Sequence, residues 1–140
     1  DPKKQNQSEI MRQLGFWSLP VVGMIVYPMT IFSGIGYDLP VTTIAMLLCG
    51  VIFIVVGNYM PKAKQNYTVG IKLPWTLHDT ENWNKTHRLA GFLWVIGGIL
   101  FLVAAFLPGG AILTLGITLV MVLVPTVYSY LLYRKKQKSE

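Results

Sequence analysis

The sequence predicts an all-α membrane protein: a bundle of four transmembrane helices with a cytoplasmic, interfacial loop and helix between the second and third spans. Hydrophobic residues make up 53% of the 140 residues and charged residues only 13%, about half the charged share of a typical soluble domain. The charges are also confined to a few short segments. The stretches between them are long enough to cross a bilayer, which takes about 20 apolar residues.

The four spans follow from the uncharged stretches. Stretches of 25, 23 and 45 residues without charge follow Arg12, Asp38 and Arg88, and a Pro-Gly-Gly turn at 108–110 divides the last one. The predicted spans are Leu14–Ile35, Leu39–Met60, Leu89–Leu107 and Ala111–Leu132. A helix in the core of a soluble protein would carry charges on its outer face, whereas these segments carry none on any face.

The same pattern divides the chain and orients it. The predicted parts are a cytoplasmic N-terminal segment 1–13, a transmembrane hairpin 14–60, a cytoplasmic motif loop 61–88, a second hairpin 89–133 and a basic cytoplasmic tail 134–140. All 12 Lys and Arg residues lie in the first, third and fifth parts, which share one side of a four-span bundle. The positive-inside rule therefore predicts that both termini lie in the cytoplasm. Contact with anionic lipid headgroups explains the basic residues, and no nucleic-acid-binding module is present.

Two of the predicted spans carry small residues at every seventh position. These are Thr43, Gly50 and Gly57 in the second span, and Gly91, Gly98 and Ala105 in the third. Small residues let helices approach closely in lipid. We expect the two stripes to face each other or the remaining spans, the alternative being that glycine is simply common in membrane helices.

The loop contains a helix-start signal. Thr76 is predicted to cap a helix that begins near residue 77 and runs along the interface before turning into the third span, with Asp79 three residues after the cap. Trp83, His87 and Trp94 would share one face of this helix. The tryptophans are interpreted as interfacial anchors, or His87 and its neighbours form a buried polar contact or a partner site.

No catalytic or metal-binding pattern stands out. His78 and His87 are nine residues apart and would point to opposite sides of a helix, so we expect neither a metal nor another cofactor. The sequence contains no nucleophile elbow, phosphate-binding loop or paired carboxylates, so we expect no enzyme. No charged residue or histidine lies deep in a span, which argues against ion-coupled transport.

The loop resembles the SdpI-like family of bacterial multi-pass membrane proteins. It reads NYTVGIKLPWTL from Asn66, then Trp83, then KTHRLAG from Lys85, and Gly57-Asn58 precede it. The residues that we single out as a partner-binding or structural motif are Asn58, Asn66, Tyr67, Gly70, Lys72, Pro74, Trp75, Thr76, Trp83, Thr86, His87, Arg88 and Gly91. The resemblance departs at Lys72-Leu73, where the family usually has Arg-Thr, and lysine does not reproduce a bidentate arginine contact.

This resemblance implies a function in the bacterial cytoplasmic membrane. Members of the family protect the cell that makes a secreted killing peptide of the sporulation-delaying type, and some are thought to hold a cytoplasmic repressor at the membrane. The expected partners are therefore a toxin peptide, membrane lipids and, in the receptor role, a repressor protein. Family members often have two further upstream spans, which this sequence lacks, so it is either a truncated product or a shorter form.

Two other functions remain open. The chain could be a structural membrane subunit, with the loop only seating the helices at the interface. It could also be a small transport or channel component, in which polar residues of the spans line a path: Thr30, Ser33, Thr114, Thr118, Thr126 and Ser129.

Overall fold

Four long helices make up most of the chain. The computed structural model describes residues 3, 5 and 9–140, and within this part it contains helices, turns and loops but no strand. The long helices are α1 (Glu9–Gly34), α2 (Val41–Tyr59), α4 (Thr80–Ala104) and α5 (Gly110–Ser139), and each is long and apolar enough to span a membrane. Two short helices, η2 (Met60–Lys62) and α3 (Pro74–His78), lie between α2 and α4. The predicted four-helix membrane fold is thus confirmed.

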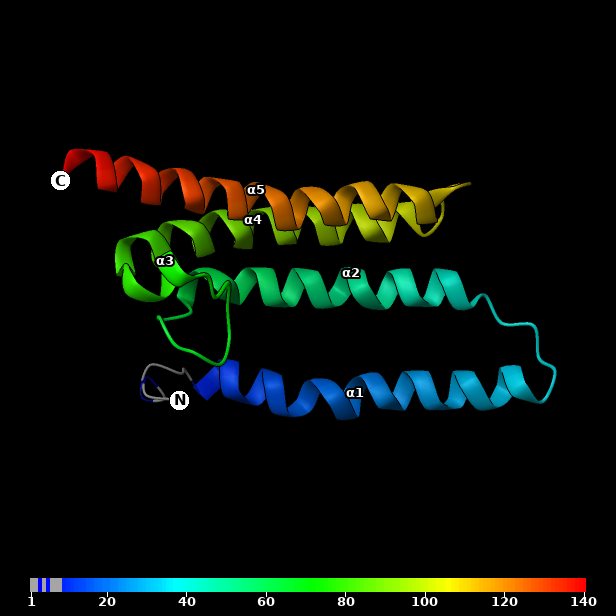
Figure 1. Cartoon of the computed structure of the whole chain (residues 1–140). Coiled ribbons are helices and arrows are strands. Elements are labelled where there is room, and N and C mark those ends of the chain that lie inside the picture. Colours follow the sequence, from blue (N-terminus) through cyan, green and yellow to red (C-terminus); the bar gives the residue numbers. More distant parts are fainter. Residues whose placement is uncertain (1–2, 4, 6–8) are drawn as a thin grey trace.

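The long helices run alternately up and down, so the bundle has two ends (Figure 1). We call one end the loop end; it holds residues 60–80 and the C-terminal part of α5. The other is the turn end, where residues 35–40 and 105–109 connect the helices. The motif loop thus lies beside the last turns of α5.

The start of α4 differs from the prediction. Instead of one interfacial helix capped by Thr76, the chain forms the short helix α3, breaks at Asp79 and then continues as α4 without interruption to Ala104. Asp79 has an extended backbone, and its carboxylate accepts hydrogen bonds from the backbone N–H groups of Glu81 (3.0 Å) and Asn82 (3.3 Å). Asp79 is therefore the N-cap of α4, and Trp83 and His87 belong to its first turns.

Glycines set the close approach of α2 and α4. A Cβ atom added at Gly98 would lie 2.6 Å from the carbonyl oxygen of Gly50, and one added at Gly91 would lie 2.6 Å from that of Gly57. Because real Cβ atoms do not come so close to a backbone oxygen, only glycine permits this crossing. The prediction that the two stripes face each other is confirmed at these four positions.

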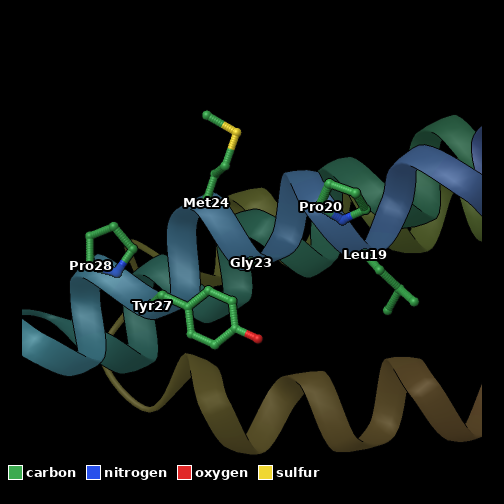
Figure 2. A pocket seen from close by; sticks show the side chains of 6 residues that line it. All are labelled: Leu19, Pro20, Gly23, Met24, Tyr27 and Pro28. Atoms are coloured by element: carbon green, nitrogen blue, oxygen red, sulfur yellow. The ribbon is translucent and has the colours of Figure 1, made fainter.

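Helix α1 lies apart from the other three (Figure 1). None of its residues is buried, and a Cβ atom at Gly23 would meet only Tyr27 of the same helix. A shallow groove runs along it, lined by Leu19, Pro20, Gly23, Met24, Tyr27 and Pro28, and Figure 2 labels these residues on the helix. The packed core of the described chain consequently lies among α2, α4 and α5.

Candidate functional site

Trp83 and His87 fasten the motif loop to α4. The fully buried indole of Trp83 donates a hydrogen bond from Nε1 to the carbonyl oxygen of Ala63 (2.8 Å) and stacks on the ring of His87, with centroids 4.0 Å apart. Nε2 of His87 accepts from the backbone N–H of Ile71 (2.9 Å), and its Nδ1 lies 2.8 Å from the carbonyl oxygen of Trp83. Nε2 is therefore unprotonated and Nδ1 carries the hydrogen, so this geometry fixes a neutral imidazole.

Gly70 is required by this stacked pair. Its φ of +124° is one that residues with a side chain rarely adopt, and an added Cβ would lie 2.6 Å from Nε2 of His87 and 2.7 Å from the Trp83 ring. The loop backbone can therefore reach the pair only at a glycine.

Asn66 organises the middle of the loop. Its buried side-chain oxygen accepts from the backbone N–H groups of Thr68 (2.9 Å) and Val69 (2.7 Å), and its amide donates to the carbonyl oxygen of Lys64 (2.7 Å). The side chain thus satisfies three backbone groups that no regular secondary structure would pair.

Thr76 performs a similar role in α3. Its fully buried hydroxyl accepts from the backbone N–H of Leu73 (2.9 Å) and lies 2.8 Å from the carbonyl oxygen of Ile71, to which it donates. Thr76 therefore closes the first turn of α3 from its third position, and it is not the N-cap that the sequence predicted.

A buried polar network joins α3, α4 and α5. The indole Nε1 of Trp75 donates to Oγ of Ser129 (2.7 Å), and that hydroxyl donates to Oδ1 of Asn82 (2.7 Å). The Asn82 amide donates to the Ser129 carbonyl oxygen (3.0 Å), and Thr86 donates its hydroxyl hydrogen to Oδ1 of Asn82 (3.0 Å). The Trp75 ring also stacks on Tyr133, with centroids 5.5 Å apart. Through this network, three separate segments hold one another at the loop end.

Sequence reasoning missed two members of this network. Asn82 was not among the motif residues, and Ser129 was considered only as part of a transport path. The available signal for Asn82 was its position one turn before Thr86, on the face of α4 that also carries Trp83. Ser129 had no comparable signal, because its partners lie 47 and 54 residues away.

The other polar residues of the proposed path do not gather in the same way. The hydroxyls of Thr30, Thr114, Thr118 and Thr126 each donate to a carbonyl oxygen of their own helix. They therefore satisfy their hydrogen bonds locally, and the structure does not bring them together with Ser129.

The motif divides into buried and exposed members. Asn66, Thr76, Trp83, Thr86 and His87 are buried, and Gly91 is buried at the crossing with α2. Trp75 is partly buried, whereas Asn58, Tyr67, Gly70, Lys72, Pro74 and Arg88 are exposed. Most of the chemically distinctive residues thus hold the loop in place, and only the exposed set can meet another molecule.

Ion pairs neutralise the two acidic residues that begin α4. Lys85 lies 2.6 Å from Glu81, and Lys136 of α5 lies 3.1 Å from Asp79. Burial acts to raise the pKa of Asp79. The hydrogen bonds from Lys136 and from the backbone N–H groups of Asn82 and Glu81 outweigh it and hold this pKa below its ordinary value of 3.8. In the described part of the chain, no three His, Cys, Asp or Glu side chains are placed to hold a metal ion.

Comparisons with known proteins single out the same region. A family model described as the SdpI/YfhL protein family matches residues 62–129. The protein named "Immunity protein SdpI" of Bacillus subtilis (strain 168) is 33% identical over 112 residues, which are 79% of this chain and 54% of that protein. The chain thus spans about half the length of this relative. No solved structure matches.

Proposed function

This chain belongs to the SdpI/YfhL protein family, and we propose that it is a membrane immunity protein that protects its cell from a secreted peptide toxin. The observation that carries the proposal is the 33% identity, over 79% of the chain, to a protein named as an immunity protein. The four apolar helices and this relationship make the chain a multi-pass membrane protein. Protection would therefore take place in the membrane or at its surface.

Protection by this chain would depend on binding and not on catalysis. The polar side chains at the loop end are engaged with one another: His87 holds Ile71, and Ser129 holds both Trp75 and Asn82. None of these contacts pairs a nucleophile with a base. Such a network preorganises the loop, so that a partner does not have to order it on binding.

We further propose that the loop end faces the cytoplasm and presents its exposed motif residues to a repressor protein. The proposal is supported by the concentration of Lys and Arg at this end and by the exposure of Lys72 beside the anchored residue Ile71. Capture of cytoplasmic proteins by the parent, but not by a Lys72→Gln variant, would support this role. Identical sets of captured proteins would rule it out.

Survival of toxin-sensitive bacteria tests the immunity proposal. Cells that express the parent chain should survive a dose of sporulation-delaying-type peptide that kills cells with an empty vector. His87→Ala, which removes the acceptor for Ile71, should lose protection at an equal membrane level, whereas Ser18→Ala, an exposed change in α1, should keep it. Death of cells that contain well-inserted parent protein would contradict the proposal for this chain.

A further inference from the structure

The loop end carries a surplus of positive charge on a defined surface. Residues 60–88 and 134–140 contain nine Lys and Arg residues but only three acids. Two of these acids, Asp79 and Glu81, are already paired with Lys136 and Lys85. Lys62, Lys64 and Arg88 are exposed, and the described residues give none of them an acidic partner. We call these three residues the basic collar.

Buried anchors hold the backbone of the basic collar in place. Lys62 and Lys64 flank Ala63, whose carbonyl oxygen accepts the hydrogen bond from the buried Trp83 indole (2.8 Å). Arg88 follows His87, which is buried and holds the loop at Ile71. The backbone that carries the three cations is therefore held in place, and this lowers the entropic cost of binding an anion.

The basic collar lies where the uncharged stretches of α2 and α4 end. Helix η2, which ends at Lys62, continues α2 directly, and Arg88 immediately precedes the apolar stretch that begins at residue 89. A Cβ atom at Gly91 would lie 2.7 Å from the Pro61 ring, so η2 packs against α4 within one turn of Arg88. The Lys62 ammonium also lies 5.2 Å from the centroid of the Tyr59 ring. Aromatic rings beside basic residues at span ends are typical of the headgroup layer.

We propose that the basic collar binds the phosphate-bearing headgroup of an anionic membrane lipid. Its position at the span ends favours a lipid over an acidic protein, because headgroup phosphates already occupy this depth and a soluble partner would first meet the residues farther out. The binding stabilises the loop end against the membrane surface. This inference depends on the basic collar alone and holds whether or not the chain confers immunity.

Native mass spectrometry of the purified full chain in neutral detergent tests the proposal. The probes are phosphatidylglycerol and phosphatidylcholine with identical acyl chains. The parent should bind phosphatidylglycerol at several-fold lower concentration than phosphatidylcholine. The variant Lys62→Gln/Lys64→Gln/Arg88→Gln should lose at least about tenfold of the affinity for phosphatidylglycerol, because each basic residue near the surface contributes on the order of fivefold.

A charge-matched variant separates the basic collar from general attraction. Arg134→Gln/Lys135→Gln/Lys138→Gln removes the same charge from exposed tail positions and should keep the affinity for phosphatidylglycerol within about threefold. Equal binding of the two lipids by the parent, or equal losses in the two variants, would overturn the proposal. A second result would also overturn it: the parent shows no lipid preference in detergent but, in phosphatidylcholine nanodiscs, binds polyglutamate through the basic collar. The surface would then fit an acidic protein.

Discussion

At the scale of single residues, two side chains connect segments that are distant in the sequence. His87 joins the loop at Ile71 to α4, and Ser129 joins Trp75 of α3 to Asn82 of α4. Ser129 both accepts and donates through one hydroxyl, and its side chain is fully buried. Loss of one of these hydrogen bonds costs more stability than loss of an exposed one, because no water molecule can replace the missing partner of a buried polar group.

Ser129→Ala should lower the free energy of unfolding by about 1–3 kcal/mol, because the Trp75 indole N–H loses its acceptor and Asn82 loses a donor. Chemical unfolding of the purified chain in one detergent, followed by tryptophan fluorescence, measures the change. The control Ser18→Ala removes an exposed hydroxyl that bonds only to a carbonyl of its own helix and should change stability by less than about 0.5 kcal/mol. Equal effects of the two substitutions would contradict the network.

At the scale of elements, the crossing of α2 and α4 depends on backbone contact at glycines. The atoms nearest to Gly98 include the Gly50 carbonyl oxygen and the backbone nitrogen of Ile54. These backbone atoms cannot move aside as the end of a flexible side chain can. Backbone atoms move only if the whole helix moves. The interface therefore has little capacity to absorb even one methyl group.

Gly98→Ala should therefore destabilise the chain by about 1–3 kcal/mol, since the new methyl group would overlap backbone atoms of α2. Gly116→Ala is the matched control, because a Cβ atom there meets nothing within 4 Å, and it should be neutral or slightly stabilising. Thermal unfolding of both variants in the same detergent gives the comparison. A Gly98→Ala protein as stable as the Gly116→Ala protein would mean that α2 and α4 do not cross at these glycines.

Asp79, at the start of α4, should make the free energy of unfolding depend on pH. Its pKa is lowered in the folded chain, so the carboxylate stabilises the fold fully above about pH 4, and this contribution is lost as the pH falls through the folded-state pKa. The difference in unfolding free energy between the parent and Asp79→Asn should accordingly shrink below about pH 4. Lys136→Gln, which removes the partner at 3.1 Å, should show the same trend. A difference that stays constant from pH 7 to pH 3 would exclude this ion pair as its source.

At the scale of the whole molecule, the two ends of the bundle differ in charge. All 12 Lys and Arg residues lie in three stretches: residues 3–12, which end in the first turn of α1, residues 62–88, and residues 134–138 near the C-terminal end of α5. The turn end contains Asp38 and no basic residue. This asymmetry predicts one orientation in the membrane.

Labelling of single cysteines in intact cells tests that orientation. In a Cys49→Ala background, Asp38→Cys at the turn end should react with a membrane-impermeant maleimide, whereas Lys138→Cys in the tail should react only after the cells are permeabilised. Both positions are exposed, so access and not burial decides the result. Labelling of Lys138→Cys in intact cells would reverse the topology and with it the proposed repressor contact.

The sequence predicted some parts of the site better than others. The glycine stripes of α2 and α4 followed from spacing, because a sevenfold repeat makes a stripe along any regular helix, whereas the pairs Gly50–Gly98 and Gly57–Gly91 came from the structure. The predicted N-cap role of Thr76 was wrong, because Thr76 lies at the third position of α3 and Asp79 caps α4. The break at Asp79 depends on how its carboxylate, α3 and Lys136 of α5 meet in space.

By itself, the sequence determined the number of spans, their approximate limits and the family. Bilayer thickness acts on each segment separately, so the length and charge of a segment decide whether it can cross. Only the tertiary structure decided which motif residues are buried anchors and which are exposed, and that Asn82 and Ser129 belong with them. The contacts of Ser129 join residues 47 or more positions apart, and they exist only because α5 packs against α3 and α4.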